Sequence, residues 1–129
     1  MKRQSLRLQA KGPTIWVTID TETISVAITI GRRALAAGGH WLEAGTPLIS
    51  SRGIKAIEAL VKTFAGSTIV ADFKTMDGGD VDVGMAARAG AHVITEMAVA
   101  EDATIKKAVE EARKHRLGVI ADILAAKDK

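Results

Sequence analysis

The chain has 129 residues, of which 47% are hydrophobic and 26% are charged. That length is enough for one compact domain and too short for two, and the composition excludes wholesale disorder. Cysteine is absent, which excludes disulfides, thiolate nucleophiles and cysteine-ligated zinc. Because no stretch reaches the ~18 uncharged apolar residues of a membrane span, and no signal-peptide core is present, we expect a cytoplasmic protein with no membrane partner.

The formal net charge of +3 comes from the N-terminus, where the basic residues are Lys2, Arg3, Arg7 and Lys11. Without these four, 14 basic residues stand against 15 acidic ones, so the rest of the chain is close to neutral. We therefore predict a basic N-terminal tail over residues 1–13 and a single domain over residues 14–129. Aromatic residues make up only 3% and tyrosine is absent, so no nucleic-acid partner is expected.

Short runs rich in β-branched residues recur along the chain, and each ends in a carboxylate. The runs are residues 14–20 (TIWVTID), 41–43 (WLE), 68–72 (TIVAD), 92–96 (HVITE) and 119–122 (VIAD), and their final acids are Asp20, Glu43, Asp72, Glu96 and Asp122. Successive acids are between 23 and 29 residues apart. A period of this size predicts repeated βα units and a parallel sheet.

The segments between these runs read mostly as helices. Apolar residues at helical spacing predict helices over residues 51–64 and 102–115, and residues 80–89 predict a shorter helix that ends at Gly90. Residues 21–37 partly alternate as a strand would, but a helix is expected there because parallel strands need a crossover.

Ligands of parallel α/β proteins bind beyond the carboxyl ends of the strands, so the five acids are expected to face one rim. A single acid after a strand is most often a turn residue or a helix cap. Five clustered carboxylates would repel one another unless a cation or a lysine lay among them. This pattern points to a divalent metal, and hard oxygen ligands suit Mg²⁺.

The string VADFKTMDGGD at residues 70–80 is the most informative local motif. Asp72 and Lys74 are two residues apart in an extended segment and so share one side of it, and Asp77 follows in the loop. A lysine held between two acids can stabilise a developing enolate oxygen or deliver a proton. The same residues could instead form only a surface ion-pair cluster.

This motif resembles the DxKxxD signature of the orotidine 5′-monophosphate decarboxylase suprafamily. Its Lys-Thr-Met-Asp form is similar to the 3-hexulose-6-phosphate synthase family in particular, as are LEAGTPLI at residues 42–49, GMAARAGAHVIT at residues 84–95 and VAEDATIKKAVEEARKH at residues 99–115. The resemblance extends from about residue 16 to residue 122.

The resemblance implies a TIM-type (β/α)8 barrel, a homodimer, and Mg²⁺-dependent aldol addition of formaldehyde to ribulose 5-phosphate through an enediolate. Glu43 and Asp72 match the magnesium ligands of the family, and Asp20 matches its substrate-binding acid on the first strand. Lys74 matches the lysine that stabilises the enediolate, and Asp77 matches the acid that reaches into the partner's site.

Residues 14–129 supply about five of the eight strands of such a barrel, so we expect an incomplete barrel without the family's phosphate-binding units. A homo-oligomer, or a partner chain that completes the barrel, is expected to cover the open sheet. Glu96 stands where the family usually has an apolar residue and is expected to add a charge to the mouth. His40, His92 and His115 are interpreted as structural or exposed residues.

Two other functions remain open at this stage. A related enzyme of the suprafamily, such as a 3-keto-L-gulonate-6-phosphate decarboxylase, would use the same metal and enediolate chemistry. A non-catalytic barrel remnant that acts as a binding or assembly module would explain the missing phosphate site.

Overall fold

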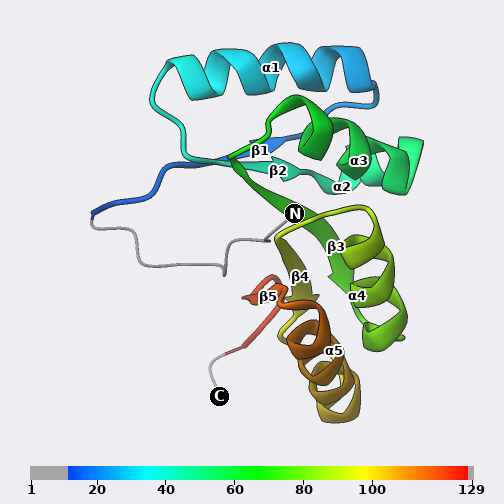
Figure 1. The fold of residues 1–129 in the computed structure, drawn as a ribbon. Coiled ribbons are helices and arrows are strands. Elements are labelled where there is room, and N and C mark those ends of the chain that lie inside the picture. The colour runs from blue at the N-terminus through cyan, green and yellow to red at the C-terminus, as the bar shows by residue number, and fades with distance from the viewer. Residues whose placement is uncertain (1–11, 128–129) are drawn as a thin grey trace.

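The computed structural model describes residues 12–127, so most of the predicted basic tail lies outside the described residues. The elements in chain order are β1 (Trp16–Ile19), α1 (Ile24–Ala36), β2 (Trp41–Ala44), α2 (Thr46–Arg52), α3 (Ile54–Thr63), β3 (Thr68–Thr75), α4 (Gly79–Arg88), β4 (Val93–Met97), α5 (Asp102–His115) and β5 (Gly118–Asp122) (Figure 1). Within residues 12–127, no helix has the length and apolar character needed to cross a membrane.

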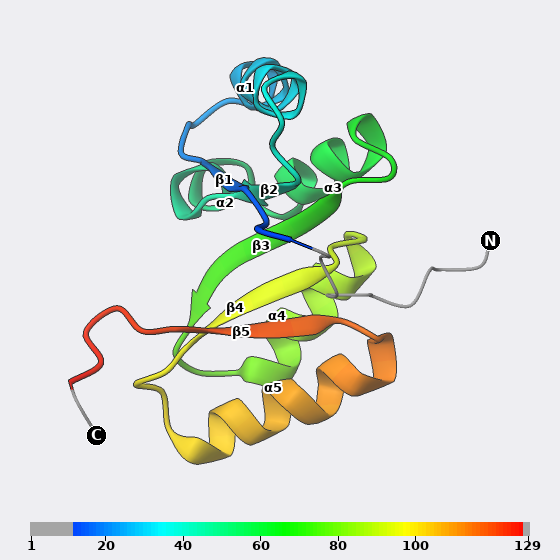
Figure 2. The same cartoon turned by 90° about the vertical axis from the view of Figure 1, so that its left-hand side faces the viewer.

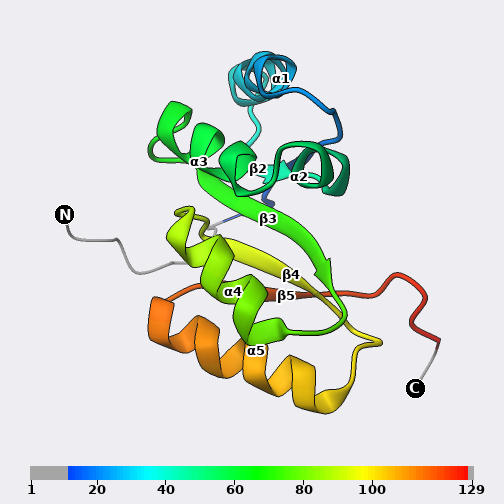
Figure 3. The ribbon, with the colours of Figure 1, turned by 90° about the vertical axis from the view of Figure 1, so that its right-hand side faces the viewer.

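The strands form one parallel sheet in the order β1-β2-β3-β4-β5, so each strand pairs with the next one in sequence. Helices α3 and α4 lie in front of the strands in Figure 3, whereas β4 and β5 pass in front of α4 in Figure 2. The helices therefore cover one face of the sheet. A sheet whose consecutive strands are joined by helices on the same side has the architecture of a barrel wall.

Alternation along the strands sends every second side chain into the layer between the sheet and the helices. Ile19, Leu42, Ile69 and Ile94 are fully buried there, against helix residues that include Leu60. Burial of one such side chain is worth about 1.5–3 kcal/mol relative to leaving it in water. This layer is the hydrophobic core of the described chain.

The prediction of one helix over residues 51–64 is wrong in its extent, because two helices occupy residues 46–63. Pro47 lies in the first turn of α2, where its fixed φ and missing N–H are tolerated. Gly53 separates α2 from α3 with a φ of +60°, a left-handed value that glycine adopts without strain.

The helix expected over residues 21–37 is confirmed as α1. Its β-branched residues give it a weak helix propensity, and tertiary packing supplies the stabilisation that the local sequence lacks. Gly31 lies so close to α3 that a Cβ there would stand 2.7 Å from Phe64 Cζ. The ring of Phe64 therefore occupies the space that a side chain at position 31 would need.

Two histidines at the amino ends of strands accept hydrogen bonds from backbone amides of the neighbouring strand. The N–H of Ile15 donates to His40 Nδ1 at 3.1 Å, and the N–H of Ile69 donates to His92 Nδ1 at 3.0 Å. Both rings lie at the opposite end of the sheet from the strand-end acids. The interpretation of these two histidines as structural residues is confirmed.

Candidate active site

A cavity of about 240 Å³ opens at the carboxyl ends of the strands, on the face of the sheet that the helices leave bare. Its lining consists of Trp16, Glu43, Asp72, Lys74, Thr95, Ile120, Ala121, Asp122 and Ile123. Four of the five strands therefore contribute a polar or charged side chain close to the strand end, and β1 contributes the indole of Trp16.

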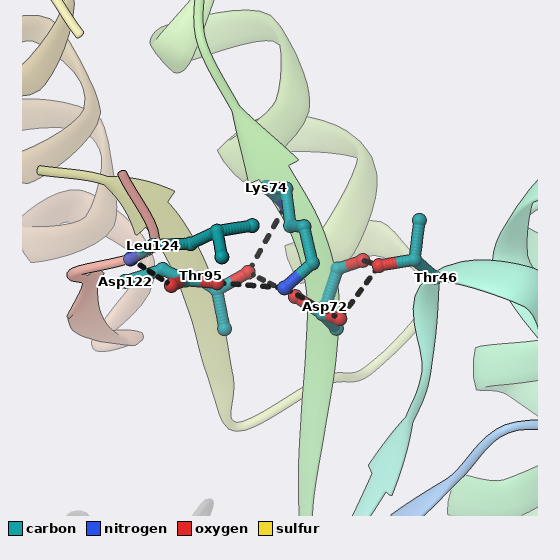
Figure 4. Close-up of polar contacts among 6 residues, drawn as sticks. All are labelled: Thr46, Asp72, Lys74, Thr95, Asp122 and Leu124. Carbon is teal, nitrogen blue, oxygen red and sulfur yellow. Dashed lines mark hydrogen bonds and ion pairs between the residues drawn. The ribbon is translucent and has the colours of Figure 1, made fainter. Parts of the chain in front are cut away.

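Lys74 is the centre of the charged groups in this cavity (Figure 4). Its Nζ lies 2.7 Å from Asp122 Oδ2 and 3.4 Å from Asp72 Oδ2, and 36% of its side chain is exposed. The hydrogen bond to Asp122 raises the pKa of Lys74 above its ordinary value. The same hydrogen bond, together with one from the N–H of Leu124, lowers the pKa of Asp122. Lys74 is thus held as a cation whose exposed side faces the cavity.

The backbone of Lys74 is unusual as well. The register of β3 against β4 shifts between Ala71 and Thr75, and Lys74 has a φ of +49°. A non-glycine residue in this left-handed region is strained and persists only where its surroundings hold it. One such support is the hydrogen bond from the N–H of Lys74 to Thr95 Oγ1 at 3.1 Å. A bulge of this kind re-aims a side chain next to an active site.

Two threonines fix the carboxylate of Asp72, which is 4% exposed. Thr46 Oγ1 donates to Asp72 Oδ2 at 2.6 Å, and Thr95 Oγ1 donates to Asp72 Oδ1 at 2.8 Å. These bonds pair both carboxyl oxygens of a buried acid and fix its orientation.

Glu43 is the second buried acid of the cavity, with 6% of its surface exposed. Burial, and then the charge of Asp72, raise the pKa of Glu43 to about 7, although hydrogen bonding and the charge of Lys74 act in the opposite direction. Two buried carboxylates that act on each other are an environment where an added cation is favoured.

The structure brings Glu43, Asp72 and Lys74 together, and it leaves Asp20 and Asp77 outside the cavity. Asp20 is exposed, and a Cβ added to Gly45 would collide with its Oδ1, so its carboxylate lies against the start of α2. Asp77 is exposed in the loop before α4, where its Oδ1 accepts the N–H of Gly78 at 2.7 Å.

The prediction that Glu96 faces the mouth with the other acids is wrong. Thr95 points into the cavity, so the next residue on β4 points to the helix-covered side, where Glu96 is 2% exposed. The nearest charge that acts on it belongs to Asp82 of α4. A strand-end position does not reveal the face of the sheet, because neighbouring residues of a strand point to opposite faces.

Asp122 is a site residue to which the sequence motif alone assigns no role. It ends the fifth β-rich run as Asp72 ends the third, and that repetition predicted its place at the rim but not its contact with Lys74. Its distance to Lys74 is shorter than that of Asp72. Thr46 and Thr95 were missed altogether, because their contacts depend on the tertiary fold rather than on any local pattern.

Residues 13–128 match the model of the orotidine 5′-phosphate decarboxylase / HUMPS family. The chain belongs to this family. It is 41% identical over 87 residues to a 3-hexulose-6-phosphate synthase of Staphylococcus haemolyticus, a match that covers 67% of this chain and 41% of the relative.

Solved structures of the family give the same result. A 3-hexulose-6-phosphate synthase superimposes with a TM-score of 0.82 at 34% identity, over 85% of this chain and 53% of that one. A 3-keto-L-gulonate-6-phosphate decarboxylase of Vibrio cholerae superimposes with a TM-score of 0.79 at 31% identity, over 83% and 50%. The chain therefore spans about half the length of these structures, and the expected partial TIM-type barrel is confirmed.

The donor set of this family member fits a hard cation. Among residues 12–127, no group of three or more histidine, aspartate or glutamate side chains is arranged to hold a metal ion. Glu43 and Asp72 are the two buried acids of the cavity that could hold such a cation. Their number suits Mg²⁺, which usually binds one or two carboxylates and keeps several waters. The raised pKa of Glu43 supports this fit, because a cation beside it would relieve the repulsion from Asp72.

Proposed function

We propose that this chain carries the catalytic half of an aldehyde-lyase of the 3-hexulose-6-phosphate synthase type, which adds formaldehyde to ribulose 5-phosphate with the help of Mg²⁺. The observation that supports this proposal most directly is the placement of Lys74, between Asp72 and Asp122 in a cavity that also contains Glu43. The relatives named 3-hexulose-6-phosphate synthase support a sugar phosphate as the substrate class.

The proposed reaction begins when a base takes a proton from the carbon next to the substrate carbonyl, which leaves an enediolate and the protonated base. That carbon then attacks the carbonyl carbon of formaldehyde, a carbon–carbon bond forms as the C=O π bond breaks, and the protonated base gives its proton to the former aldehyde oxygen. Mg²⁺, when bound, polarises the carbonyl oxygen and makes the adjacent C–H more acidic.

Lys74 would stabilise the oxygen that gains negative charge, because its ammonium group is held in place by two carboxylates before the substrate arrives. Glu43 and Asp72 would hold the cation, and the two threonines keep Asp72 oriented for that role. Asp20 and Asp77 are proposed to act on the substrate from outside the cavity, Asp77 in the site of a partner subunit.

The uncovered face of the sheet supports a further part of the proposal, namely association with another polypeptide. Among the described residues, β1 and β5 each have one neighbouring strand, and Trp16, Ile123 and Leu124 remain exposed along this face and at its end. A second copy of the chain is the proposed partner, and a chain that carries the remaining strands is the other candidate. Sedimentation equilibrium at micromolar concentration tests this, and a clean monomer would contradict self-association.

Turnover of ribulose 5-phosphate and formaldehyde in the presence of Mg²⁺ tests the proposed reaction. The assay is run with the chain alone and again with an added polypeptide that carries the last three βα units of the Staphylococcus haemolyticus relative. Product is expected at least in the second case, and Lys74→Ala is expected to abolish it. Absence of product in both cases would overturn the proposal.

The structural likeness to 3-keto-L-gulonate-6-phosphate decarboxylase supports a second candidate function, decarboxylation of a sugar-acid phosphate by the same residues. Ribulose 5-phosphate with formaldehyde and 3-keto-L-gulonate 6-phosphate are compared in parallel with the same protein preparation, and release of carbon dioxide from 3-keto-L-gulonate 6-phosphate would favour this candidate.

A non-catalytic role is supported if calorimetry detects no binding of either sugar phosphate to the assembled protein.

A further inference from the structure

Glu96 is a buried acid that has no hydrogen-bond partner among the described residues. It is 2% exposed, and neither of its carboxyl oxygens accepts or donates a hydrogen bond. Its register neighbours are Thr75 on β3 and Ala121 on β5. An ionised carboxylate in such a place is strongly unfavourable, so the group binds a proton instead.

The groups packed around Glu96 offer no positive charge to balance an ionised form. On α4, Asp82 is the group whose charge acts on it, and Thr75 Oγ1 already donates to Asp82 Oδ2 at 2.7 Å. Helix α5, which packs beside α4, buries only Ala108 and Ala112 on its inner side. Within residues 12–127, no lysine, arginine or histidine forms an ion pair with Glu96.

We propose that Glu96 is held as a neutral carboxylic acid beside an ionised Asp82, so that the two acids carry one negative charge, and that this pair keeps the Lys74 bulge in place. The connection to the bulge is direct on both strands. Thr75, which Asp82 anchors, follows Lys74 on β3, and Thr95, which accepts the N–H of Lys74, precedes Glu96 on β4.

Loss of the proton from Glu96 would place two like charges in the space between β4 and α4. The bonds from Thr75 to Asp82 and from Lys74 to Thr95 are the ones that repulsion would loosen. The backbone of Lys74 is strained, so it depends on these supports to keep its conformation. The placement of Lys74 would thus become sensitive to pH, and the consequence for turnover rests on the proposed function.

The electrostatics of the pair agree with this geometry. Burial, and then the charge of Asp82, raise the pKa of Glu96 to about 7 from its ordinary value of 4.5. Burial also raises the pKa of Asp82, and the hydrogen bond from Thr75 partly offsets that. Because the native state keeps a proton that the unfolded chain loses at lower pH, stability falls as the pH rises through this window and levels off above it.

Carbon-13 NMR of the glutamate side-chain carboxyls in the wild-type protein tests the protonation state directly. The Glu96 signal is expected to titrate with a midpoint near pH 7, and the backbone amide signal of Lys74 is expected to move over the same range. A Glu96 midpoint at the ordinary value of 4.5, or a Lys74 amide that ignores the transition, would overturn the inference.

Two variants separate this effect from other titrations. Glu96→Gln mimics the neutral acid and should remove the part of the pH-dependent movement of the Lys74 amide that Glu96 causes, leaving only the part that Glu43 causes. The matched exposed control Glu58→Gln on α3 should keep both parts. Asp82→Asn removes the repulsion and should shift the Glu96 midpoint to lower pH. If Glu96→Gln and the wild type lose stability in parallel between about pH 5 and pH 8, the inference fails. Glu43 is present in both proteins, so its contribution to the pH dependence of stability cancels in that comparison.

Discussion

Thr95 donates a hydrogen bond to Asp72 Oδ1 at 2.8 Å, and the same hydroxyl oxygen accepts the N–H of Lys74 at 3.1 Å. One side chain of β4 therefore fixes both the acid and the lysine of the β3 motif. We predict that Thr95→Val lowers the free energy of unfolding by about 1–3 kcal/mol, because it leaves buried polar groups unpaired. Urea denaturation measures this loss.

Thr95→Ser is the matched control, since it keeps the hydroxyl and removes only a methyl group. It should retain most of the free energy of unfolding that Thr95→Val loses. Equal losses in the two variants would mean that the methyl packing of Thr95 matters more than its hydrogen bonds.

The ion pair between Asp122 and Lys74 predicts a dependence of stability on acid pH. The folded state lowers the pKa of Asp122 below its ordinary value of 3.8, so the pair contributes stability above that value and loses it as the pH falls through the folded pKa. Asp122→Asn should therefore be less stable than the wild type at neutral pH, and the difference should shrink toward acid pH. Thermal unfolding measured over that range checks this, with Glu58→Gln as a control that tracks the wild type.

Mg²⁺ binding is predicted to depend on Glu43 and Asp72. Replacement of either by its amide, in Glu43→Gln or Asp72→Asn, should weaken binding by about tenfold or more, because each removes a charged oxygen ligand. Titration calorimetry with magnesium chloride measures the affinity. Glu101→Gln, an exposed position before α5, should bind as the wild type does. Unchanged affinity in both amide variants would place the metal elsewhere.

Two glycines of α4 are predicted to respond to alanine with opposite signs. A Cβ at Gly79 would stand 2.7 Å from the carbonyl oxygen of Thr104 and 2.8 Å from Ala108 Cβ. Because backbone cannot easily move away, Gly79→Ala should destabilise the protein by about 1–3 kcal/mol. The space at Gly84 ends at the flexible tip of Arg88, 3.3 Å away, so Gly84→Ala should stabilise the helix by up to about 1 kcal/mol.

Urea denaturation of both variants checks this pair of predictions, and far-UV circular dichroism confirms that each remains folded. The prediction requires only that the two substitutions change the free energy of unfolding in opposite directions, and the two changes need not be equal in size. Stabilisation by Gly79→Ala would show that α4 and α5 can separate without cost.

The period of the β-rich runs was sufficient to predict five parallel strands and the helices between them, because strand alternation and helical spacing are local patterns. The break between α2 and α3 escaped prediction since it depends on the left-handed backbone of Gly53. The acids at the strand ends were identified from sequence, but the face on which each lies was not. Glu96 shows why, since a shift of one residue moves a side chain from one face of a sheet to the other.

Within the site, the motif at Asp72 and Lys74 was predictable because the two residues lie close in sequence. The partners that hold them were not predictable, because Thr46, Thr95 and Asp122 reach the motif from three other elements. The register shift in β3 brings Lys74 into its position, and nothing in the local sequence encodes that shift.

The imidazoles at His40 and His92 give the amino end of the sheet a function separate from the chemistry at its other end. Each ring can accept its backbone N–H only while Nδ1 carries no proton, so each ties two strands together in its neutral form alone. The same hydrogen bond from a backbone N–H to a histidine ring occurs twice, first between β1 and β2 and then between β3 and β4. Two of the four strand pairs therefore carry a side-chain hydrogen bond at their amino ends, in addition to the backbone ladder that joins all five strands.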